Sequence, residues 1–125
     1  MKRLWWLVAW VAACATGCTL HTVRPADQYP VLPETVATPM GTVTVRRMPN
    51  LMVDSTKAWG VWFWDKRLIV VEANMPNDMA WVVLYHELCH VAFTMSGLNY
   101  TTPSAHQEAI CDALATARFR ERFSH

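Results

Sequence analysis

The sequence has 125 residues, of which 53% are hydrophobic, and this is enough for one compact domain and too little for two. Basic and acidic residues nearly balance at 11 and 10, which gives a formal net charge of +1. This balance, without a basic stripe, excludes an electrostatic nucleic-acid binder, and we expect no nucleic-acid partner.

Residues 1–17 have the layout of a bacterial signal peptide: a basic start, a short apolar run and an exit of small residues. The run is too short for a stable transmembrane helix. Ala15-Thr16-Gly17-Cys18 resembles a lipobox, in which the cysteine is acylated. Val11-Ala12-Ala13-Cys14 resembles it too, but cleavage at Cys14 would leave an unusually short leader. We predict lipidation at Cys18; the alternatives are an ordinary cleaved signal and an uncleaved anchor.

This leader predicts a lipid-anchored protein of the cell envelope, with the membrane as a partner through the anchor. Without Lys2 and Arg3 the mature chain has no polybasic membrane patch. Thr19, rather than Asp, follows the cysteine, so we expect the outer membrane and a domain that faces the periplasm. The proline-rich stretch 18–40 is interpreted as an extended tether, and residues 41–125 as the domain.

The first half of the domain is predicted to be β-structure. Residues 42–46 alternate between polar and apolar side chains, as in a half-buried strand that Pro49-Asn50 ends. The aromatic and β-branched runs 59–64 and 68–71 flank Asp65-Lys66-Arg67, which indicates a hairpin. Three tryptophans here could stack on carbohydrate, but we expect them in the core of the small domain; they are Trp59, Trp62 and Trp64.

Two helices are predicted to follow. Residues 79–95 are almost entirely apolar around the helix axis, which predicts a buried helix, and Gly97 suits its C′ position. Ser104-Ala105-His106-Gln107 has the form of a capping box and opens a helix to about Arg122. Strands before helices indicate a small α+β domain: a small antiparallel or mixed sheet followed by two packed helices.

The first helix carries polar residues that need a reason for burial. His86 and His90 are four residues apart, so both imidazoles lie on one face and can reach one metal ion. Glu87 lies beside them, in the H-E-x-x-H arrangement of zinc metalloproteases. Burying these groups with hydrogen bonds alone would be costly, so we favour a zinc site over a polar cluster.

A catalytic zinc ion needs a third protein ligand. Residues 91–97 contain no histidine, which leaves His106, Glu108, Cys111 and Asp112 as candidates. Glu108 and Asp112 share one helix face, which fits Glu108 on the metal and Asp112 behind it, orienting a ligand histidine. The alternative for Glu108 is a carboxylate that only interacts with the helix dipole.

H-E-x-x-H followed on a later helix by E-x-x-x-D resembles the gluzincin branch of the zincins, and residues 108–115 also resemble the second-helix motif of ImmA/IrrE-type metallopeptidases. The resemblance covers residues 59–118. It implies a zincin-like metallopeptidase with Zn²⁺, a peptide or protein substrate lying along a strand, and Glu87 as general base. The departures are a short linker of 17 residues between His90 and Glu108, and Cys89 where glycine is common.

The implied reaction would gain from a donor to the oxyanion. Tyr100 and His106, in or just after the loop between the helices, are the candidates, and the alternative is that both are plain loop residues.

Cys89 and Cys111 each lie three residues after a predicted ligand, His86 and Glu108 respectively. If those ligands share one ion, the cysteines come close together, and related motifs place small residues there. We predict proximity that allows a disulfide; the alternative is two reduced, buried cysteines.

Two rival hypotheses also place the protein in the cell envelope but assign it no catalytic activity. One is a non-catalytic zinc-binding lipoprotein, and the other is an interaction lipoprotein without a metal. Glu87 separates the first from a protease, because a purely structural site needs no general base.

Overall fold

The computed structural model describes residue 25 and residues 28–124. The predicted leader, with Cys14 and Cys18, lies outside these residues. No helix in the described part is long and apolar enough to cross a membrane. The elements in chain order are β1 (Thr35–Thr38), β2 (Gly41–Met48), β3 (Met52–Val53), β4 (Thr56–Lys57), β5 (Gly60–Phe63), β6 (Leu68–Glu72), α1 (Asn77–Ser96), the 3-10 helix η2 (Leu98–Tyr100) and α2 (Ser104–Phe123).

Four strands form one mixed sheet in the order β1-β2-β6-β5, and β3 pairs with β4 in a separate two-stranded sheet. β2 and β6 are parallel, while the other two pairs of the mixed sheet are antiparallel. The predicted α+β class and the hairpin of β5 and β6 are therefore confirmed. β5 is left as an edge strand, and this position matters for the site.

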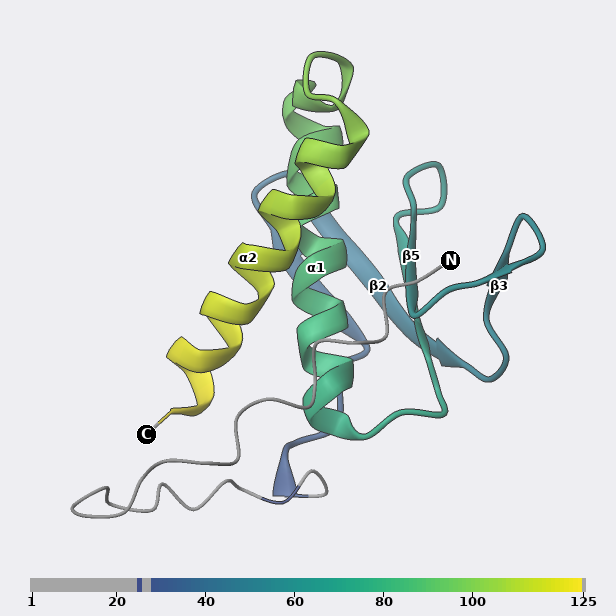
Figure 1. Ribbon diagram of the computed structural model, residues 1–125, viewed down its shortest axis with the longest axis vertical. Coiled ribbons are helices and arrows are strands. Elements are labelled where there is room, and N and C mark those ends of the chain that lie inside the picture. Colours follow the sequence, from purple (N-terminus) through teal and green to yellow (C-terminus); the bar gives the residue numbers. More distant parts are fainter. Residues whose placement is uncertain (1–24, 26–27, 125) are drawn as a thin grey trace, which may run out of the picture.

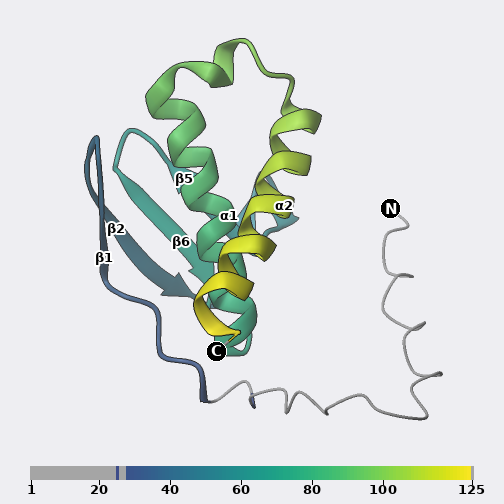
Figure 2. The same ribbon diagram turned by 90° about the vertical axis from the view of Figure 1, so that its left-hand side faces the viewer.

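The layers explain why the first helix is apolar on every side. α1 lies between the sheet and α2, which runs back along it in the opposite direction (Figures 1 and 2). Because both faces of α1 are covered, apolar side chains are stabilised around most of its circumference. The buried core consists of Tyr29, Val43, Val45, Ile69, Val71, Ala80, Trp81, Leu84, Tyr85, Val91 and Ala115.

The domain begins earlier than the sequence indicated, and the tether prediction was wrong for residues 28–40. β1 pairs with β2 along its whole length. Tyr29 is buried against the rings of Phe119 and Phe123, and the indole of Trp81 donates a hydrogen bond of 2.7 Å to the Pro30 carbonyl. This short edge strand is half exposed and follows several prolines, so it lacks the apolar periodicity that would have indicated a strand.

The helix ends show one confirmed prediction and one that was wrong. Gly97 has a φ of +77° and ends α1 in the left-handed conformation, as predicted. The capping box does not form, because Pro103 takes the N-cap position and Ser104 already lies inside α2. Gln107 instead donates hydrogen bonds to the carbonyls of Asn99 and Thr102, which ties α2 to the preceding loop.

Glu72, at the end of β6, is fully buried and holds the turn after β2. Its carboxylate accepts hydrogen bonds from the backbone amides of Leu51, at 2.7 Å, and Asn50, at 3.1 Å. The Leu51 amide is the largest cause that holds the pKa of Glu72 below its usual value. A carboxylate with a depressed pKa stabilises the fold above the unfolded pKa, and this contribution is lost as the pH falls through the folded pKa.

We therefore expect Glu72→Gln to lower the thermal stability near neutral pH, because its amide group would face a buried N–H donor. The difference from wild type should shrink as the pH falls from about 7 through the folded pKa of Glu72, below which the wild-type carboxyl is also protonated. Thermal unfolding followed by circular dichroism over this pH range measures this. A difference that stays constant with pH would contradict the assignment.

Candidate metal centre

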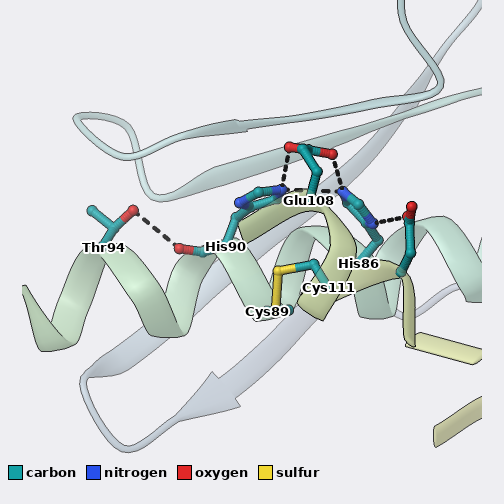
Figure 3. Close-up of a disulfide and its surroundings, with 7 residues drawn as sticks. His86, Cys89, His90, Thr94, Glu108 and Cys111 are labelled. Carbon is teal, nitrogen blue, oxygen red and sulfur yellow. Dashed lines mark hydrogen bonds and ion pairs between the residues drawn. A yellow bond between two sulfur atoms is a disulfide. The ribbon is translucent and has the colours of Figure 1, made fainter. Parts of the chain in front are cut away.

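Two histidines and one glutamate converge between α1 and α2. The Nε2 atoms of His86 and His90 lie 3.1 Å apart on one face of α1. The Glu108 carboxylate reaches across from α2, with oxygens 3.1 Å from His86 Nε2 and 2.9 Å from His90 Nε2 (Figure 3). The candidate ligand atoms all lie within 4.8 Å of one another, so this group could hold a metal ion.

The surroundings of the two imidazoles favour the forms that can bind a metal ion. Asp112 Oδ1 lies 2.8 Å from His86 Nδ1, which directs the proton to Nδ1 and leaves the Nε2 lone pair facing the centre. Burial lowers the pKa of His90, against an opposing effect of Glu108, and so favours the neutral imidazole that a metal requires. The contact between Asp112 and His86 has the geometry expected of a carboxylate behind a ligand histidine.

Glu87 is nearly buried, with 7% of its surface exposed, and lies beside the triad. Burial raises the pKa of Glu87 to about 8, with a smaller contribution from the negative charge of Glu108. Its side chain packs against Gly60 at the start of β5, where a Cβ atom would lie 2.9 Å from Glu87 Oε1. Gly60 was not among the residues predicted for the site, although a glycine within a strand can signal a close backbone approach.

The triad opens into a cavity of about 690 Å³. One wall comes from the helices and carries the polar groups, and the other comes from β5 and the turns around it. The helix wall consists of Val82, Val83, His86, Glu87, His90, Thr94, Glu108 and Asp112, and the strand wall of Val53, Ala58, Trp59, Gly60, Val61, Trp62 and Trp64. The site therefore joins a polar centre to an apolar wall.

The expectation of three core tryptophans was wrong for two of them. Trp62 packs against the core, and its indole donates a 3.2 Å hydrogen bond to Thr94 Oγ1. Trp59 and Trp64, however, are 52% and 70% exposed and line the cavity. They lie just outside the two ends of β5, where no second layer covers them. In the sequence, only the neighbouring turn residues indicated that these two tryptophans lie outside the strand.

The structure does not bring the two proposed oxyanion donors to the centre. Tyr100 is 88% exposed, in η2. Neither it nor His106 is among the residues that line the cavity. Tyr100 ends the short helix η2, and His106 lies in the first turn of α2.

Cys89 and Cys111 form a disulfide between α1 and α2, with their Cα atoms 5.4 Å apart, which confirms the predicted proximity (Figure 3). Each cysteine immediately precedes a residue of the centre, His90 on α1 and Asp112 on α2. The bond therefore fixes the two helices to each other at the level of the candidate ligands.

Replacing both cysteines by alanine should lower the free energy of unfolding by about 2–4 kcal/mol. We also expect weaker metal binding, because α2 would no longer hold Glu108 at a fixed distance from the histidines. Chemical denaturation and zinc titration measure the two effects. Wild-type protein with a reduced disulfide should behave like the double variant, and a double variant with unchanged stability and affinity would contradict this role.

Comparisons with protein-family models, with curated proteins and with solved structures gave no match.

Proposed function

We propose that this protein is a small zinc-dependent metalloprotease that hydrolyses peptide bonds, with Glu87 as its general base. The observation that carries the proposal is that a His-His-Glu group and a further, buried carboxylate line one cavity. A site that held a metal only for structure, or only for binding, would not need that extra carboxylate. Glu87 therefore favours catalysis over a non-catalytic zinc-binding protein.

The residues fit zinc in kind and in spacing. Two imidazoles and one carboxylate are a common ligand set of catalytic zinc sites, which keep one position open. Bonds of about 2.0 Å in a tetrahedral site imply ligand separations of about 3.3 Å. The two histidine Nε2 atoms lie 3.1 Å apart, and one ligand atom from each of the three residues lies within 4.8 Å of the others, so a modest adjustment admits the ion. The open position would face the cavity, where a substrate can enter.

The chain's own residues supply the remaining parts of the reaction. A bound zinc ion provides Lewis acidity, which activates water and polarises the substrate carbonyl. In its ionised form, which the positive charge of a bound zinc ion would favour, Glu87 takes the proton of the attacking water and passes it to the leaving amine. Asp112 holds His86 in the required tautomer. The free edge of β5 offers backbone groups to an extended peptide, which would add as a further strand.

A degradation assay tests the proposal directly. Purified protein is incubated with zinc and a diverse peptide mixture, and mass spectrometry identifies new termini. We expect cleavage that a chelator abolishes and added zinc restores. A folded, zinc-loaded protein that cleaves no peptide of the mixture would overturn the proposed activity.

We also propose that the domain acts in the cell envelope, anchored by acylated Cys18. The support is the lipobox-like sequence before that cysteine. Mass spectrometry of the mature N-terminus tests it: a diacylglyceryl cysteine is expected, and an unmodified N-terminus would contradict the anchor.

A further inference from the structure

The edge strand β5 runs alongside α1, and the candidate ligands lie between its two points of contact with that helix. At its start, a Cβ on Gly60 would lie 2.6 Å from the Val83 side chain. Near its end, Trp62 bonds to Thr94. His86 and His90 fall between Val83 and Thr94 along α1. The strand therefore passes the metal centre from one side to the other.

The two exposed tryptophans lie at the two ends of this passage. Trp59 immediately precedes β5 and Trp64 immediately follows it, and both line the cavity that contains the triad. The four residues of β5 lie between them, so five residue steps of extended chain span about 16 Å at about 3.3 Å per residue. An extended peptide bound along β5 would thus meet one indole on each side of the metal.

The surroundings of these indoles are suited to apolar side chains. Val53 and Ala58 continue the strand wall beside Trp59. Lys57 places its ammonium group 5.2 Å from the centre of the Trp59 ring, which orients that indole. Exposed apolar side chains that gather around one cavity mark the site of a ligand or partner more often than scattered ones do. Trp62 differs from them, because it packs against the core and its indole bonds to Thr94, so it has a role in the fold itself.

We propose that Trp59 and Trp64 form two apolar subsites that bracket the metal centre, so that the preferred substrate is an extended peptide with a bulky apolar side chain on each side of the scissile bond. This inference rests on the proposed protease function and names its substrate class. The two matching side chains must lie on one face of the bound peptide, so they are about four or six residues apart, because alternate residues of a strand point to opposite faces.

Peptide binding to the zinc-loaded Glu87→Gln protein tests the subsites apart from the chemistry. The probes are dye-labelled, capped eight-residue peptides with two phenylalanines four or six positions apart, and the controls have alanine at one or both positions. Fluorescence anisotropy should show binding at least about tenfold weaker when either phenylalanine is removed. Trp59→Ala or Trp64→Ala should weaken binding similarly and make it insensitive to one phenylalanine, whereas Trp→Phe at either position should largely preserve it.

The outcomes separate this inference from the proposed function. If the wild type cleaves peptides with no preference for bulky apolar residues, and the tryptophan variants bind the probe normally, the subsites are refuted and the protease stands. Tryptophan-dependent binding without any cleavage by the wild type supports the subsites and refutes the protease. A chito-oligosaccharide that binds where the peptide does not would identify a sugar-stacking surface and overturn the proposal.

Discussion

Glu87→Gln should leave the fold and the bound zinc unchanged while peptide hydrolysis falls by about 10²–10⁴-fold, the usual contribution of a general base. Glutamine has nearly the same shape, so it fits the narrow space between α1 and Gly60. Its amide cannot accept the proton of the attacking water. Metal retention is expected because the candidate ligands are His86, His90 and Glu108.

The measurement compares kcat/KM and zinc content for wild type, Glu87→Gln and a control, Glu121→Gln. Glu121 is an exposed residue near the end of α2 and lies outside the cavity lining. The control should cleave and bind zinc like the wild type. A Glu87→Gln protein that retains zinc and cleaves peptides at the wild-type rate would remove Glu87 from the mechanism.

The sequence predicted the parts of the centre that depend on helical register. His86 and His90 share a face whatever surrounds the helix, and the same spacing relates Glu108 to Asp112. The proximity of Cys89 and Cys111 then followed from the assumption that the ligands on both helices bind the same ion. The helical spacings are local, and the proximity of the cysteines rests on a single assumption. Both could therefore be predicted without knowing the fold, and the observed geometry agrees with them.

The missed features depend on contacts that are distant in sequence. β2 pairs in parallel with β6, across a connection that includes β3, β4 and β5, and no local pattern fixes that register. The close approach of Gly60 to Glu87 follows only from this topology. The exposure of Trp59 and Trp64 also depends on where the sheet ends, since an aromatic residue suits a strand in a core or in a cavity wall equally well.

Arg47 shows how such long-range contacts position α1. From β2, its guanidinium donates hydrogen bonds to the carbonyls of Glu72, Ala73 and Met75 and to the Asn77 side chain. These bonds fix the chain between the end of β6 and the first turn of α1. In the sequence Arg47 appears only as a charged residue on a strand, so nothing indicated that it orients the helix carrying the histidines.

Glu108→Ala should weaken zinc binding by more than about 100-fold, because it removes a ligand, whereas changes behind the ligands usually cost about 10–100-fold. The consequence for stability follows from mass action. At a free zinc concentration of 100 times the wild-type Kd, the ion stabilises the wild type by about 2.7 kcal/mol. A variant with a Kd 100-fold higher gains only about 0.4 kcal/mol at the same concentration.

Zinc titration and thermal unfolding with and without zinc measure both effects, with two matched variants beside Glu108→Ala. Asp112→Asn should fall between Glu108→Ala and wild type, because it leaves the ligands in place but weakens the orientation of His86. Glu121→Ala, on the exposed part of the same helix, should match the wild type. If Glu108→Ala binds zinc normally while His86→Ala does not, the third ligand is not Glu108, and the two-helix centre would have to be completed by another group.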